Sequence, residues 1–368
     1  MCSAGTSPTS HQGKGPANSA GPLPTFVKLE SDWFYVKLTD RALKGNGTVF
    51  SDLKPTEVLA AAERLRSVVK RTPLIESEML SDIAGGPVFL KLENRQTTGS
   101  FKLRGAFNVL STLDREARAR GVVASSAGNH GLGVAYAAKQ LGISATIFIP
   151  STAAQVKRDG IAALGALLDT SQPHYDAAMA AALEFAAARG ATFVNPCAGE
   201  KLYAGQGTIA LEILSELPNL ATLVVSVGGG GLLGGCASFV RAVSPGTRIV
   251  GAQSENTAAM SLSLAEGRVV EIDNLPTIAE GLAGQIDDEG LEIGQHALDG
   301  IVTLTENEVA RTIGWLWSEH GERAEGAGAC AVGAVWLRKL DQIATPAAII
   351  VSGGNIDDAK FERMTTDD

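Results

Sequence analysis

Short apolar segments alternate with helical segments through most of this chain, and no other feature of the sequence restricts the fold as much. The apolar segments are four to six residues long, and the segments between them have the spacing of amphipathic helices. Strands 122–125 and 145–149, for example, are expected on either side of a helix at 131–141. Strands joined in this way form βαβ units, which build mostly parallel sheets covered by helices on both faces.

The alternation predicts an α/β fold with two open, twisted sheets. Beyond the three elements above, we expect strands at 88–93, 166–169, 191–194, 222–227, 248–253 and 347–352, and helices at 55–70, 100–113, 152–164, 175–189, 206–216, 231–243, 257–265 and 306–320. Ligands of such sheets bind at the carboxyl ends of the strands, usually in the crevice between domains.

The domain division expected from these elements is uneven. Residues 25–111 and 200–360 form a large domain, 112–199 a small domain, and 361–368 a C-terminal tail. Residues 1–24 are rich in Ser, Gly, Ala and Pro and are expected to be a disordered leader. The stretch 25–53 fits either an edge strand or an arm that lies on a neighbour.

Charge and cysteine content exclude several classes of protein. The formal net charge of −9 argues against a nucleic-acid or anionic-membrane partner. The four cysteines, at positions 2, 197, 236 and 330, have no metal-ligand spacing and suit a reducing compartment. No apolar run approaches the length of a membrane span, and no secretory signal is recognisable. A cytoplasmic location is expected.

One decapeptide, residues 97–106 (TTGSFKLRGA), lies at the junction between an expected strand and an expected helix. Lys102 would project from the first turn of that helix, where the positive end of the helix dipole and partial desolvation both favour a neutral, nucleophilic amine. Taken alone, such a lysine is more often a solvated surface charge.

Four consecutive glycines, Gly228 to Gly231, lie between an apolar strand and a helix that begins with Leu232 and Leu233. Backbone N–H groups can converge there, and the helix N-terminus adds a favourable dipole, so the run predicts a phosphate-binding site. The spacing matches neither the Rossmann fingerprint nor a P-loop.

Two further strand ends carry polar groups. Residues 125–131 (SSAGNHG) offer hydroxyls, an amide and backbone N–H groups at a helix start, which suit either a carboxylate site or an ordinary helix cap. Residues 351–355 (VSGGN) follow the last expected strand. Ser352 can either hydrogen-bond a heterocyclic nitrogen or form a simple turn.

Together with the segments 204–208 (AGQGT) and 277–281 (TIAEG), these motifs resemble the fold-type II pyridoxal-phosphate enzymes. The resemblance is to the threonine/serine dehydratase and serine racemase branch of this fold, which is that of the tryptophan synthase β chain. It covers roughly residues 69–357, and the motifs occur in the family's order.

The resemblance implies a role for each motif. Lys102 would hold pyridoxal 5′-phosphate as a Schiff base and then act as the base toward the substrate Cα. The other cofactor-binding residues would be Phe101 beside the ring, Asn129 on the ring hydroxyl, Gly228, Gly229, Gly230, Gly231 and Leu232 at the phosphate, Glu325 near the ring, and Ser352 on the pyridine nitrogen. The substrate's α-carboxylate would be bound by Ser126, Ala127, Asn129 and His130.

A neutral serine at the pyridine nitrogen makes the ring a weaker electron sink and favours loss of a β-substituent. The resemblance therefore implies dehydration and deamination of a β-hydroxy-α-amino acid, such as threonine, serine, hydroxyaspartate or phenylserine, to a 2-oxo acid and ammonia. The alternative is an amino-acid racemase or a β-replacement synthase on the same scaffold. Relatives are usually dimers, so a homodimer is expected.

Three departures from the family pattern refine this prediction. Ala127 stands where the racemase has a proton-donating serine, so racemisation should be weak. Gln253 and Ala259 replace the acidic ligands of a divalent cation, so no metal is expected at that site. The loop 195–199 (NPCAG) differs from the pattern of plain threonine enzymes, and the chain stops too soon after Ser352 for a regulatory domain.

Overall fold

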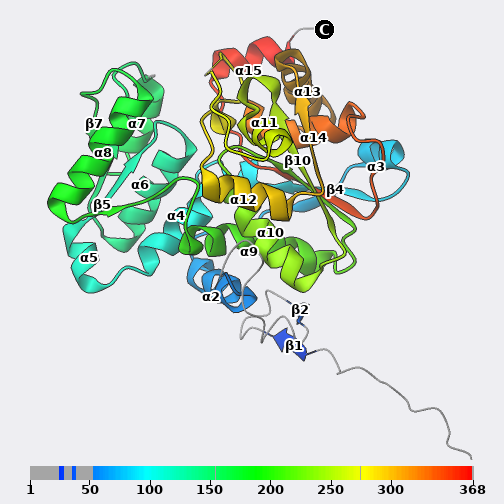
Figure 1. Ribbon diagram of the computed structural model, residues 1–368, viewed down its shortest axis with the longest axis horizontal. Coiled ribbons are helices and arrows are strands. Elements are labelled where there is room, and N and C mark those ends of the chain that lie inside the picture. Colours follow the sequence, from blue (N-terminus) through cyan, green and yellow to red (C-terminus); the bar gives the residue numbers. More distant parts are fainter. Residues whose placement is uncertain (1–24, 29–34, 39–52, 154, 274, 367–368) are drawn as a thin grey trace, which may run out of the picture.

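Two sheets organise the chain in a computed structural model that describes residues 25–28, 35–38, 53–153, 155–273 and 275–366. In this described part, the larger sheet has six strands in the order β11-β10-β9-β12-β4-β3, and the smaller has four in the order β7-β6-β5-β8. Figure 1 shows them as two lobes, with the smaller sheet and its helices on the left. The predicted α/β fold with two mostly parallel sheets is confirmed.

The large lobe contains the larger sheet, in which β3 runs antiparallel to β4 and the other neighbouring strands are parallel. Its strands are β3 (Leu74–Glu76), β4 (Val88–Leu92), β9 (Thr222–Ser226), β10 (Arg248–Ser254), β11 (Gly300–Leu304) and β12 (Ala347–Val351). Its helices are α2 (Pro55–Leu65), α3 (Glu78–Ala84), α9 (Glu200–Glu216), α10 (Gly231–Val243), α11 (Ala259–Glu266), α12 (Asp288–Ala297), α13 (Glu306–His320), α14 (Gly326–Trp336) and α15 (Asp358–Thr365), with 3₁₀ turns η1 (Glu93–Arg95), η2 (Glu255–Thr257) and η3 (Glu280–Leu282).

The small lobe contains the parallel four-stranded sheet. Its elements are β5 (Val122–Ser125), β6 (Ala145–Phe148), β7 (Leu167–Asp169), β8 (Thr192–Phe193), α5 (Arg115–Arg120), α6 (Asn129–Leu141), α7 (Gln155–Ala162) and α8 (Tyr175–Arg189). Helix α4 (Lys102–Ser111) packs on α6 of this lobe and on α9 of the large lobe, and therefore lies at their junction.

The central strands of the larger sheet are buried on both faces because successive side chains point to opposite sides. In β9, Leu223 and Val225 join one hydrophobic core, whereas Val224 joins the core on the other face. In β12, Ile350 and Ile349 divide in the same way. This arrangement explains why these strands read as continuous apolar runs rather than as alternating ones.

Several elements differ from the sequence prediction. Helices α3, α5, α12, α14 and α15 and strands β3 and β11 were not expected, and α9 begins at Glu200 rather than at residue 206. Helix α14 is rich in glycine and alanine and is buried on all sides, so it lacks the amphipathic spacing that identifies a surface helix. The expected tail at 361–368 belongs in part to α15, which packs on α13.

The amino-terminal predictions fall mostly outside the described residues. The expected leader at 1–24 lies wholly outside them, and of the stretch 25–53 only short segments are described. There, β1 (Thr25–Lys28) and β2 (Tyr35–Leu38) pair as antiparallel strands.

Candidate active site

Lys102 is the first residue of α4, and its position is fixed by backbone pairing with the segment that follows β12. The N–H of Phe101 donates to the carbonyl oxygen of Ser352 at 3.1 Å, and Ser100 forms an antiparallel bridge with Gly353. Two motifs separated by about 250 residues of chain therefore lie side by side at the carboxyl ends of β4 and β12, which are neighbours in the sheet.

The Lys102 amine lies at the junction of the lobes. Its Nζ donates to the carbonyl oxygen of Pro196 at 2.7 Å and lies 5.1 Å from the centre of the Phe101 ring. Pro196 belongs to the loop after β8, in which the Asn195 side chain accepts hydrogen bonds from the N–H groups of Cys197 and Ala198. The loop of the small lobe thus holds the amine carried by α4.

Glycines allow the first turn of α4 to approach its neighbours closely. A Cβ at Gly205 of α9 would lie 2.5 Å from the Arg104 carbonyl oxygen, and one at Gly133 of α6 would lie 3.2 Å from the backbone of Lys102 and Leu103. The AGQGT segment therefore acts as a packing surface for the helix that carries Lys102.

Arg104, two residues beyond Lys102, is fully buried in a network of charges that the sequence did not reveal. Its guanidinium binds Glu93 through two hydrogen bonds of 2.8 Å and Glu212 through bonds of 2.7 and 3.0 Å. Lys91 also lies 2.6 Å from Glu212, so two cations face two anions. Burial acts to raise the pKa of Glu93, but the charge of Arg104 holds it below its ordinary value. This network ties α4 to β4 and α9.

The four glycines form a tight loop between β9 and α10. Gly230 has a φ of +96°, which favours glycine, and a Cβ at Gly229 would lie 2.7 Å from the Cys197 sulfur. A Cβ at Gly228 would lie 3.1 Å from Leu282, and one at Gly231 would lie 3.0 Å from the Cys197 carbonyl oxygen. Leu232 follows in the first turn of α10 and is buried. At Gly228, Gly229 and Gly231 a side chain would crowd its neighbours, and the loop meets the N-terminus of a helix, a position that suits a phosphate.

Asn129, the first residue of α6, is held from the large lobe. Its Nδ2 donates to Glu325 Oε1 at 2.5 Å, and its Oδ1 accepts from Asn355 Nδ2 at 2.7 Å. Burial raises the pKa of the Glu325 carboxyl to about 7, although the hydrogen bond from Asn129 and the positive charges of Lys157 and Lys102 oppose this rise. Glu325 precedes α14 as its N-cap residue.

His130 is buried and keeps a neutral ring. Burial and then the positive charge of Lys102 lower its pKa to about 3. Because a carbonyl oxygen only accepts, the 2.8 Å contact between Nε2 and Val194 O makes Nε2 the donor and leaves a lone pair on Nδ1. The ring therefore has no N–H left to donate to a carboxylate.

Ser126 and Ala127 precede Gly128, the N-cap residue of α6, and complete this loop. Ser126 and Ala127 are half-buried, and Ser126 Oγ accepts a 3.2 Å hydrogen bond from the N–H of Gly128. In the large lobe, Ser352 is buried, and its hydroxyl makes a long 3.4 Å contact with the Ala327 carbonyl oxygen.

Several buried polar atoms around Lys102 lack a partner. Within the described residues, no hydrogen bond reaches Thr98 Oγ1, Ser100 Oγ, Ser125 Oγ or His130 Nδ1. Buried polar atoms in proteins are normally paired, so unpaired ones beside a strand end indicate a bound molecule. These atoms lie in the segments that lead into α4 and α6 and in the first turn of α6, next to the candidate residues Lys102 and Asn129.

The chain is similar in sequence to a family of known enzymes. The sequence pattern of the family described as "Pyridoxal-phosphate dependent enzyme" matches residues 65–353. The chain belongs to this family. The pyridoxal-phosphate-dependent enzyme is 42% identical over 309 residues to L-threonine ammonia-lyase of Thermotoga maritima, an alignment that covers 84% of this chain and 77% of the relative.

Two solved structures show the same fold. The processed form of threonine deaminase isoform 2 from Solanum lycopersicum is 32% identical with a TM-score of 0.79, covering 93% of this chain and 99% of that one. Maize serine racemase is 28% identical with a TM-score of 0.80, covering 85% of this chain and 97% of that one. These neighbours agree with the branch that the motifs indicated.

The residues of this pyridoxal-phosphate-dependent enzyme fit its cofactor. The cofactor presents a phosphate, an aldehyde, a ring hydroxyl and a ring nitrogen. The loop of Gly228 to Gly231 consists only of glycines and meets a helix N-terminus, which suits the phosphate, and the Lys102 amine suits the aldehyde. Asn129 and the Ser352 hydroxyl supply polar groups for the ring.

Gln253 and Ala259 do not offer the charged oxygens of a cation site. The Gln253 amide is buried, donates to Thr257 O at 3.0 Å and accepts from the Ser261 N–H at 2.9 Å, so it bridges this loop directly. Throughout the described part of the chain, no group of three or more His, Cys, Asp or Glu residues is arranged to hold a metal ion. Likewise, none of the helices described there is long and apolar enough to cross a membrane.

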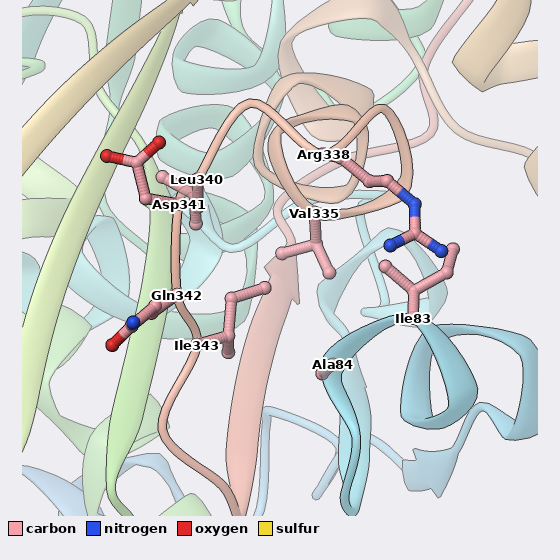
Figure 2. A pocket seen from close by; sticks show the side chains of 8 residues that line it. All are labelled: Ile83, Ala84, Val335, Arg338, Leu340, Asp341, Gln342 and Ile343. Carbon is pink, nitrogen blue, oxygen red and sulfur yellow. The ribbon is translucent and has the colours of Figure 1, made fainter.

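A pocket of about 530 Å³ lies elsewhere in the large lobe. Figure 2 shows that it is lined by α3, the end of α14 and the loop 338–343, including Ile83, Val335 and Arg338. It contains none of the residues described above. The candidate active site is therefore identified by its polar groups and not by this pocket.

Proposed function

We propose that this enzyme eliminates water from a β-hydroxy-α-amino acid and releases a 2-oxo acid and ammonia. The observation that carries the proposal is the Lys102 amine, which donates to Pro196 of the small lobe and follows a residue whose backbone pairs with Ser352 of the large lobe. The 42% identity to a threonine ammonia-lyase makes threonine the first substrate to test.

Each group of the chain has a part in this reaction. Lys102 removes the proton from the substrate Cα, and the Pro196 carbonyl oxygen orients its amine. Backbone N–H groups at the start of α6 bind the α-carboxylate, and those at the start of α10 bind the cofactor phosphate. Asn129, Phe101, Glu325 and Ser352 hold the ring.

When bound, pyridoxal phosphate would withdraw electrons from Cα, and its phosphate would supply an acid for the departing hydroxyl. The Ser352 side chain is neutral and makes only a weak internal contact, so its hydroxyl is available to the ring nitrogen. A neutral partner limits electron withdrawal by the ring, and this favours concerted loss of the β-hydroxyl over simple exchange of the Cα proton.

The experiment is a panel assay with the purified holoenzyme. L- and D-serine, both threonine diastereomers, 3-hydroxyaspartate and phenylserine are supplied in turn, and 2-oxo acid release is followed. We expect oxo acid from at least one of them and none from the Lys102→Ala variant. Cofactor-loaded enzyme that releases no oxo acid from any substrate would transfer the assignment to a racemase or a β-replacement synthase.

We also propose a homodimer in a reducing, cytoplasmic compartment, and a division into domains that follows the two lobes. Among the described cysteines, Cys197, Cys236 and Cys330 are unpaired, which suits such a compartment. Light scattering of the eluted protein tests the dimer: a single species of one-chain mass would refute it.

A further inference from the structure

Asn355, the last residue of the motif after β12, is linked to two other parts of the site. Its Nδ2 donates to the carbonyl oxygen of Thr98 at 2.8 Å and to Asn129 Oδ1 at 2.7 Å. Thr98 belongs to the segment that leads into Lys102, and Asn129 begins α6 of the small lobe. One side chain thus connects the Lys102 segment, the end of β12 and the small lobe.

The donors and acceptors determine how the Asn129 amide is turned. A carbonyl oxygen only accepts, so Asn355 must present its NH₂ group to Thr98. The second hydrogen of that NH₂ group then meets Asn129 Oδ1, and Asn129 Nδ2 faces Glu325. The opposite orientation of Asn129 would place two NH₂ groups together and an oxygen against the Glu325 carboxyl group.

Gly99 provides the space that Asn355 occupies. Its φ of +73° favours glycine, and a Cβ at this position would overlap Asn355 Oδ1. The backbones of the two segments are also joined, because the Gly354 N–H donates to the Gly99 carbonyl oxygen at 2.9 Å. The location of the Asn355 side chain is therefore built into the loop before Lys102.

We propose that Asn355 is a positioning residue that fixes the Asn129 amide with Nδ2 directed at the ring hydroxyl of the cofactor. An amide nitrogen has two hydrogens, and Glu325 takes only one of them. The other hydrogen of Asn129 Nδ2 then points in one fixed direction. Because the Asn129 side chain is already ordered, less conformational entropy is lost when the cofactor binds. This inference rests on the proposed role of Asn129 toward the cofactor.

The test compares Asn355→Ala and Asn355→Asp with the unaltered enzyme. Asn355 is exposed, so neither change disturbs the core. We measure the dissociation constant of pyridoxal phosphate and the absorption maximum of the bound cofactor. The alanine variant should bind the cofactor about 3- to 10-fold more weakly, the equivalent of one hydrogen bond, and its absorption maximum should move. The aspartate variant should bind more weakly still, because a carboxylate faces Thr98 O and Asn129 Oδ1.

The matched control is Asn256→Ala, which removes an amide that also donates to a backbone carbonyl oxygen, that of Pro276 at 2.6 Å. This control variant should leave the dissociation constant of pyridoxal phosphate and the absorption maximum of the bound cofactor unchanged. Unaltered affinity and absorption in both Asn355 variants, or equal losses in the control, would overturn the positioning role. Such a result would leave the proposed function standing, since Lys102→Ala and the substrate panel test that separately.

Discussion

At the scale of single residues, the Glu325 carboxyl group is unusual because burial raises its pKa to about 7. In the unfolded chain the same group ionises near 4.5. Between these two values the unfolded state loses a proton that the folded state keeps, so the free energy of unfolding falls as the pH rises. Glu325 therefore destabilises the cofactor-free fold at neutral pH relative to pH 4.

Glu325→Gln should remove this dependence. We expect the apoprotein variant to gain on the order of 1–2 kcal/mol in stability relative to the unaltered chain between pH 4.5 and pH 8. Urea unfolding at both pH values measures this, with the exposed Glu319→Gln as control. Identical pH slopes in the unaltered and Glu325→Gln proteins would show that the carboxyl group ionises normally.

Ala127 is the residue that should limit racemisation. It lies in the loop before α6 and has no proton to give, whereas a serine at this position carries a hydroxyl that can donate one. Ala127→Ser should raise the ratio of racemised to eliminated serine at least several-fold, measured by chiral chromatography alongside oxo acid release. No rise at full cofactor loading would remove this explanation.

At the scale of elements, the position of α4 depends on glycines in the helices that flank it. A Cβ at Gly205 would meet the Arg104 carbonyl oxygen at 2.5 Å and the Gly105 Cα at 2.7 Å, and backbone atoms cannot move aside as a flexible side chain can. A substitution there must therefore separate α9 from α4. Lys102 would move with its helix.

Gly205→Ala should lower the free energy of unfolding by about 1–3 kcal/mol, as overpacking does, and should weaken cofactor binding. Gly246→Ala is the matched control, because a Cβ there meets nothing within 4 Å. Denaturant unfolding and cofactor titration of both variants make the comparison. Equal stability of the two variants would contradict the close packing of α4 and α9.

At the scale of the whole molecule, the lobes are linked by an ion pair as well as by α4. Lys157 of α7 lies 2.7 Å from Glu280 in the large lobe, and Lys360 of α15 binds the other oxygen of Glu280. Burial acts to raise the pKa of Glu280, but the hydrogen bonds from the two lysines hold it below its ordinary value. These groups are partly exposed, so their contribution to global stability is small.

Glu280→Gln should cost less than about 1 kcal/mol in global stability, yet it should increase hydrogen–deuterium exchange in α7. High salt should produce the same increase in the unaltered protein, since it screens exposed charges. The exposed Glu292→Gln serves as control. Exchange in α7 that stays constant in the variant would mean that other contacts hold the lobes together.

The sequence predicted the sheets well because short apolar strands that are buried on both faces leave a clear local pattern. It also predicted the bounds of helices α10 and α13, because each has a distinct start and an amphipathic or apolar run. It missed α14, because three glycines lower its helix propensity and its uniformly small, apolar residues leave no amphipathic pattern. Strand β3 was hidden because it has only three residues.

The candidate site likewise has residues that could be recognised in the sequence and residues that could not. Lys102, the four glycines and Ser352 could be recognised because glycine runs and strand-to-helix junctions are local features of the chain. The Arg104 network could not, because Glu93, Glu212 and Lys91 come from separate elements and meet only after folding. The neutral state of His130 likewise depends on burial and on the nearby Lys102 charge.

The sequence by itself determined the fold class and singled out the glycine loop and the lysine as candidates, because periodicity, glycine conformation and helix ends are properties of neighbouring residues. Only the tertiary structure decided which groups share a hydrogen bond or a charge. Asn355 and Asn129 are 226 residues apart, yet their amides lie 2.7 Å from one another. Distances of that kind depend on how whole sheets and helices pack, and a local pattern carries no information about them.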